Sequence, residues 1–208
     1  MPPWPITKVK FQGRYQGFQT DDIIVFCESS RGEKAKLLCQ CKLDLKFTPS
    51  STMLTKTLKN AWDDYHNTAA FSPNDLIAIV TGPLSGTDTN GVRKLLRQAE
   101  NSEDEADFIN RIQLGKFTSQ TQRTKLEVFK GHLKTINGGA DLADRELWLF
   151  LKRLRLFIYD LDILGVVNSL LRTICGVYED DANGLLAKIE QEVTYKSCLL
   201  YTSPSPRD

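Results

Sequence analysis

Hydrophobic and polar residues alternate in two neighbouring runs near the start of the chain, which predicts a β-hairpin. The runs are Asp22–Glu28 (DIIVFCE) and Lys36–Leu45 (KLLCQCKLDL), and the polar turn Ser29–Lys34 joins them. Their high apolar content predicts that both strands lie in the centre of a sheet and are covered on at least one face. A weaker alternation over Ile6–Arg14 predicts a first strand.

The pattern changes to helical spacing after the hairpin. Apolar residues recur every three or four positions from about Ser51 to His66, and Asp75–Thr81 (DLIAIVT) then predicts a buried strand. A further helix follows, with its apolar stripe at Val92, Leu95, Leu96 and Ala99. A strand followed by a helix favours a parallel crossover, so we expect an α/β fold with a mixed sheet over residues 1–100.

Residues 101–197 are more charged and mostly helical in pattern. The segment Ser102–Glu105 begins one helix with acids in its first turn, and four more are predicted at Thr118–Ile136, Asp144–Leu154, Gly165–Gly176 and Leu185–Val193. The apolar run 155–161 (RLFIYDL) predicts a last strand that returns to the sheet. We therefore expect a helical region that packs on the core.

The last residues, 198–208 (CLLYTSPSPRD), differ in character from the rest. They resemble a transposase sequencing adapter translated in frame. We expect a non-native tail on a fragment, so that the natural protein continues past Ser197. A disordered native tail is the alternative that the Pro and Ser content allows.

Composition limits the classes of function. The apolar fraction of 41% and the charged fraction of 25% are typical of a globular protein, and the net charge of +1 gives no general attraction to nucleic acid. The cysteines are odd in number and scattered, so neither a disulfide framework nor a structural zinc site is expected. The chain has no run of about 18 apolar residues, so no membrane span is predicted. No signal peptide is visible either, and we therefore expect a cytoplasmic protein.

Three polar residues of the hairpin are the candidates for chemistry. Gln40 and Lys42 are separated by one residue and point to the same face of their strand, and Asp22 begins the partner strand. Asp22 can ligate a divalent cation, Mg²⁺ or Mn²⁺, and the neutral amide oxygen of Gln40 can serve as a second ligand. Lys42 can balance charge on a phosphate. The alternative is an ordinary hairpin with a solvated polar face.

This order of elements resembles the PD-(D/E)xK restriction-endonuclease-like superfamily, in the branch with Gln in place of the second acid. The resembling elements are a strand with Asp22, a hairpin, Gln40-x-Lys42, a helix and a strand. Other segments resemble the N-terminal region of large bacterial ATP-binding defence proteins of the NACHT or STAND type. They span most of residues 6–175: GFQTDDIIVF, LLCQCKLDLKFT, AWDDYHN, AIVTGPLSGTDT and LWLFLKRLRLFIYDLD.

The resemblance implies a nuclease-like core with Asp22 as metal ligand, Gln40 in the place of the second acidic ligand and Lys42 as catalytic lysine. It also implies DNA as substrate and an NTPase region beyond the end of this chain. A catalytically inactive sensing or protein-interaction module of the same kind of protein is the alternative, because Gln40 lowers the negative charge of the metal site. Asp21 replaces Asp22 if the strand register differs by one residue.

Overall fold

The computed structural model describes residues 4–13, 17–20, 22–115, 118–159 and 165–201, and it confirms a mixed α/β fold. The chain divides into two compact units, residues 1–158 and residues 159–208. The first unit holds the sheet and α1 to α5, whereas the second holds α6 and α7. The helices that follow residue 101, up to α5, thus belong to the same compact unit as the sheet.

The sheet has five strands in the order β1-β2-β3-β4-β5. Strands β1, β2 and β3 form an antiparallel meander, and β3, β4 and β5 run parallel to one another. Parallel neighbours need crossover connections, which α1 provides between β3 and β4 and α2 to α5 provide between β4 and β5. The strand bounds are β1 Ile6–Phe11, β2 Ile23–Glu28, β3 Lys34–Lys42, β4 Leu76–Thr81 and β5 Leu154–Ile158.

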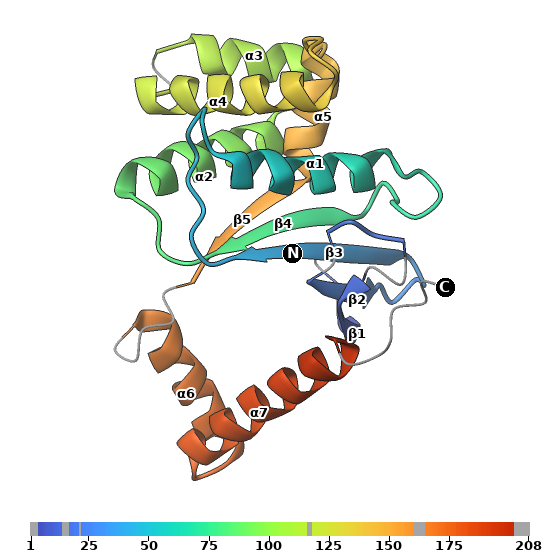
Figure 1. Cartoon of the computed structure of the whole chain (residues 1–208), viewed down its shortest axis with the longest axis vertical. Coiled ribbons are helices and arrows are strands. Elements are labelled where there is room, and N and C mark those ends of the chain that lie inside the picture. The colour runs from blue at the N-terminus through green and yellow to red at the C-terminus, as the bar shows by residue number, and fades with distance from the viewer. Residues whose placement is uncertain (1–3, 14–16, 21, 116–117, 160–164, 202–208) are drawn as a thin grey trace. The chain divides into compact units, whose positions relative to one another are not determined.

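The helices α1 to α5 lie on one face of this sheet (Figure 1), with α1 and α2 nearer to it than α3 and α4. Side-chain oxygens of Ser51, Ser85, Asp104 and Ser119 cap the first four helices at their N-termini, as expected where helices begin in turns. The helix bounds in this unit are α1 Thr52–His66, α2 Gly86–Asn101, α3 Glu105–Gln113, α4 Gln120–Ile136 and α5 Asp144–Arg153.

One large apolar core joins the sheet to all five of these helices. The rings of Trp62 in α1 and Phe150 in α5 meet edge to face with centroids 5.0 Å apart, and Phe47 and Phe129 pack at 5.9 Å. Burial of each such side chain stabilises the fold by about 1.5–3 kcal/mol. A second, smaller cluster on the other face of the sheet includes Leu37, Cys39, Leu76 and Ala78.

Strand β3 ends at Lys42, earlier than the alternation predicted. Leu43 is exposed, while Leu45 and Phe47 are buried in the core although they belong to no strand. Helix α4 holds this segment, because the ammonium of Lys125 donates to the carbonyl of Phe47 at 2.8 Å. The strand predicted to reach Leu45 therefore ends at Lys42, and Leu45 is buried by the packing of a non-strand segment.

The second unit consists of helix α6, Val166–Tyr178, and helix α7, Ala182–Tyr201. Both occupy segments that the sequence predicted to be helical, and α7 extends into the segment 198–208 that resembles an adapter. Residues 202–208 lie outside the described residues, as do residues 160 and 161 of the predicted last strand. Among the described residues, no helix is long and apolar enough to cross a membrane.

Candidate functional site

The hairpin register brings Asp22, Gln40 and Lys42 together at one end of the sheet. Ile23 pairs with Cys39, so the next residues outward, Asp22 and Gln40, face each other across the two antiparallel strands. Lys42 lies two residues further along β3, on the same face as Gln40. This is the end of the sheet at which the parallel strands β3 and β4 finish and their connections to the helices begin.

One oxygen of the Asp22 carboxylate accepts all of its hydrogen bonds. The Oδ2 atom receives the Nε2 of Gln40 at 2.5 Å and the backbone N–H of Cys41 at 2.6 Å, and the Nζ of Lys42 lies 3.9 Å away. The Oδ1 atom accepts no hydrogen bond from the part of the chain that the structure describes. The Asp22 side chain as a whole is 37% exposed to solvent.

Gln40 is buried, at 4% exposure, and the middle of α1 fixes its amide. Its Oε1 accepts from the Nδ2 of Asn60 at 3.1 Å, while its Nε2 donates to Asp22. Amide orientations are assigned from such networks. If both amides turn over together, their mutual hydrogen bond survives and the oxygen of Gln40 then faces Asp22.

Thr81 adds a polar group beside Lys42 that the sequence did not indicate as part of a site. It pairs with Lys42 in the parallel register of β3 and β4, so the two side chains share the face that carries Gln40. Thr81 is 3% exposed, and its hydroxyl has no hydrogen-bond partner among the described residues. A buried hydroxyl without a partner is costly, by about 1–3 kcal/mol, and such groups call for a functional explanation.

Asp64, near the end of α1, holds the segment that leads into Asp22. Its two carboxylate oxygens accept the backbone N–H groups of Gln19 and Thr20 at 2.7 and 2.6 Å. Burial raises the pKa of Asp64, and the hydrogen bonds from Gln19 and Thr20 oppose that shift. Asp64 is 1% exposed, so its role is to position the backbone two residues before the site.

The two cysteines next to Gln40 are held as neutral thiols. Burial raises the pKa of Cys39 to about 12, and the charge of Asp22 adds to the effect. Burial and Asp22 also raise the pKa of Cys41, whereas Lys42 opposes the change. Both thiols are free of disulfide bonds. Their side chains lie on the face of β3 opposite to Gln40 and Lys42.

The donor set around Asp22 fits a weakly held Mg²⁺ or Mn²⁺ in one arrangement. Magnesium usually keeps several waters and takes one or two carboxylates together with substrate phosphates. Asp22 supplies one free carboxylate oxygen, and Gln40 supplies an amide oxygen only after its amide turns. No group of three or more His, Cys, Asp or Glu side chains that could hold a metal occurs among the described residues.

Several partners in this site were not predicted, because they come from other elements. Asp64 carried a signal: it falls three residues after Ala61 on the apolar stripe of α1, where a charged residue is unexpected. Asn60 and Thr81 carried none. Asp21, the alternative site acid, lies outside the described residues, whereas Asp22 occupies the position that faces Gln40.

Comparison of the chain with models of known families, with curated proteins and with solved structures finds no match.

Proposed function

We propose that the chain is the nuclease-like effector domain of a bacterial defence protein and that it cleaves DNA with the help of a divalent cation. The observation that carries the proposal is the clustering of Asp22 with Gln40 and Lys42, in which the Oδ1 of Asp22 accepts no hydrogen bond from the described residues. The resemblance to the PD-(D/E)xK superfamily rests on these same three residues. It also supports an NTPase region in the full-length protein, and a cytoplasmic location remains the proposal that the sequence composition favours.

The roles of the side chains follow from their surroundings. Asp22, through Oδ1, and Gln40, through its turned amide, would hold Mg²⁺ or Mn²⁺, which polarises a phosphodiester and lowers the pKa of an attacking water. Lys42, 3.9 Å from Asp22, offsets negative charge on the phosphate as the new bond to phosphorus forms. The unpartnered hydroxyl of Thr81 provides a hydrogen bond beside Lys42 for a water or a phosphate oxygen.

A second candidate is a catalytically inactive module that senses or binds a partner. The hydrogen bonds of Gln40 favour it, because Nε2 donates to Asp22 and Oε1 accepts from Asn60 without any cation. In that case the cluster serves to join β2, β3 and α1. The two candidates differ in whether the charge of Asp22 is needed for a reaction or only for the hairpin.

Cleavage of supercoiled plasmid DNA in Mg²⁺ or Mn²⁺ separates the two candidates. We expect nicking by the wild-type chain and loss of at least about a hundredfold in rate in Asp22→Ala and in Lys42→Ala, a range typical of lost electrostatic stabilisation. EDTA should abolish the reaction in the wild-type protein. Thermal unfolding of each variant shows whether the fold survives.

Lys34→Ala is the matched control, because Lys34 is an exposed lysine at the other end of the same strand. It removes the same charge and should leave the nicking rate unchanged. If well-folded wild-type protein cleaves no DNA under any divalent cation, the inactive module is the correct alternative. Equal rates in Asp22→Ala and wild type would assign any cleavage to a contaminant or to another site.

A further inference from the structure

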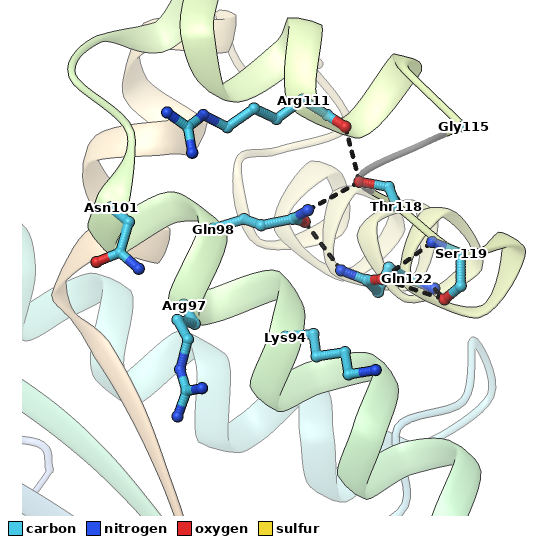
Figure 2. Close-up of a pocket in the computed structure, with 9 residues that line it drawn as sticks. All are labelled: Lys94, Arg97, Gln98, Asn101, Arg111, Gly115, Thr118, Ser119 and Gln122. Carbon is cyan, nitrogen blue, oxygen red and sulfur yellow. Dashed lines mark hydrogen bonds between the residues drawn. The ribbon is translucent and has the colours of Figure 1, made fainter.

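A basic pocket lies between α2, α3 and α4, apart from the hairpin cluster. It has a volume of about 530 Å³ and is lined by Lys94, Arg97 and Arg111 together with neutral polar residues (Figure 2). No acidic residue is among the described residues that line it. The whole chain carries a net charge of only +1, so this concentration of positive charge is local. We propose that the pocket binds the phosphate groups of an anionic ligand.

The cations come from a polar stripe of α2. Lys94 and Arg97, with Gln98 and Asn101, recur at helical spacing on the side of the helix that faces away from its buried stripe. Within the described part of the chain, neither Lys94 nor Arg97 forms an ion pair with an acid. Their charges are therefore free to be neutralised by a ligand.

Arg111 adds a guanidinium from α3, one of whose nitrogens is already hydrogen-bonded. Its Nε bonds to Asp107 at 2.8 Å, which holds the side chain in place. Its two terminal nitrogens carry further N–H groups, and these make no hydrogen bond to the described residues. An arginine fixed in this way favours an oxyanion with several oxygens, which the fork of N–H groups can bind in pairs.

A chain of hydrogen bonds makes the neutral wall of the pocket rigid (Figure 2). Gln98 donates to the hydroxyl of Thr118 at 2.9 Å, and that hydroxyl donates to the carbonyl of Arg111 at 2.7 Å. Gln122 donates to Gln98 at 2.9 Å, and its own oxygen accepts the N–H of Ser119 at 3.0 Å. Because Ser119 caps α4, the positive end of that helix also lies at the pocket.

The lining chemistry defines the class of ligand. The volume is in the range of small-molecule sites, about 300–1,000 Å³, but those sites are mostly lined by apolar and aromatic residues. Among the described residues that line this pocket, none is aromatic. The cations and polar groups that do line it suit recognition through charge and hydrogen bonds to phosphate oxygens, whether the phosphate is part of a free nucleotide or of a nucleic acid backbone.

Binding to the full chain in EDTA tests the proposal, since the chelator removes any contribution from a cation at Asp22. The probes are pyrophosphate, ATP, a single-stranded DNA oligonucleotide and citrate, measured by calorimetry at low and moderate salt. We expect a phosphate probe to bind, and binding to weaken as salt rises. The double variant Lys94→Ala/Arg97→Ala should bind at least about tenfold more weakly, as expected for lost charge-assisted hydrogen bonds.

The control is Lys130→Ala/Lys134→Ala, which removes the same charge from the exposed side chains of α4 and should bind like the wild type. Binding of pyrophosphate and ATP assigns a free phosphate ligand, and binding of the oligonucleotide alone assigns a nucleic acid backbone. The proposal is overturned if no phosphate probe binds, if citrate binds equally well, or if both double variants behave alike. Lys94 and Arg97 are exposed, so circular dichroism should show an unchanged fold.

Discussion

At Asp22 the two oxygens of one carboxylate have different surroundings. The Oδ2 atom is surrounded by donors from β3, whereas Oδ1 is free of described partners. Because these described donors gather on one oxygen, they hold the carboxylate in one orientation and leave the other oxygen without a described donor. A carboxylate that binds a cation needs one oxygen held by donors and one left for the metal. A replacement of Gln40 would remove one of the donors that hold Oδ2.

The substitution Gln40→Glu tests whether a cation can sit between β2 and β3. It removes the N–H that donates to Asp22 and places a second carboxylate at a buried position, so we expect a loss of about 3 kcal/mol in the free energy of unfolding in EDTA. Mn²⁺ should restore most of this loss. Urea denaturation with and without Mn²⁺ measures both values.

Gln40→Leu is the matched control for that experiment. Leucine also lacks the donor to Asp22, but it has no oxygen with which to bind a cation. We expect it to be destabilised and to gain much less from Mn²⁺ than the glutamate variant does. Equal stabilisation of the two variants by Mn²⁺ would mean that the cation acts elsewhere on the protein.

Asp64→Ala should destabilise the fold, because the N–H groups of Gln19 and Thr20 lose their acceptors. The N–H of Thr20 is buried and costs about 1–3 kcal/mol when unsatisfied, whereas Gln19 is exposed and its N–H can bond to water, so we expect a loss of about 1–3 kcal/mol by urea denaturation. Asp64→Asn retains one amide oxygen as an acceptor and should lose less. A loss below about 0.5 kcal/mol in the alanine variant would contradict this role.

The pH dependence of Asp64 has a definite sign. Because burial raises its folded pKa above the ordinary value of about 3.9, the folded protein binds this proton more tightly than the unfolded chain does. Its contribution to stability is full below pH of about 3.9 and is lost as the pH rises through the raised folded pKa. The stability of the wild type relative to Asp64→Asn should therefore fall with rising pH in that window, and an increase would contradict the assignment.

At the scale of elements, the segment after Lys42 approaches the loop after β4 very closely. A Cβ atom at Gly82 would lie 2.7 Å from the carbonyl oxygen of Leu43, so any larger residue displaces one of the two backbones. This contact lies one residue beyond the end of β3 at Lys42 and explains the glycine at position 82 through packing.

Gly82→Ala should lower the free energy of unfolding by about 1–3 kcal/mol, the usual cost of overpacking, and should reduce nicking by shifting Lys42. Gly86→Ala is the control, because a Cβ there meets no atom within 4 Å at the start of α2. That variant should be neutral or stabilised by up to about 1 kcal/mol. Equal stability of the two variants in urea would show that the close contact is not restrictive.

The sequence predicted elements well where periodicity was strong, and partners poorly. Alternation and helical spacing located β2, β4 and helices such as α1, and a strand followed by a helix correctly predicted a mixed sheet. The predicted end of β3 was wrong because Leu45 and Phe47 are buried against the helices without belonging to a strand. Local alternation cannot distinguish such a buried segment from a strand. Asn60 joined the site only because α1 crosses over the hairpin, a long-range contact without a local signal.

At the scale of the whole molecule, charge is unevenly distributed although its total is nearly zero. The sum of +1 gave no sign of a binding site, yet three cations line one pocket of the helical layer, and none of its described lining residues is acidic, although Arg111 is paired with Asp107. The helices of that layer share the apolar core of the sheet, so residues 1–158 form a single unit that carries both the hairpin cluster and the pocket. Composition gives only the total charge, whereas the fold gathers some of the positive charges at one place.

The central claim is that Asp22 binds a divalent cation. Electron paramagnetic resonance tests it directly by measuring the Mn²⁺ affinity of the protein. We predict that the wild-type chain binds Mn²⁺ and that Asp22→Ala binds it at least about tenfold more weakly. Lys42→Ala should bind as well as the wild type or better, because Lys42 contributes positive charge and no ligand atom. Equal Mn²⁺ affinity in wild type and Asp22→Ala, or no binding to either, would contradict the account.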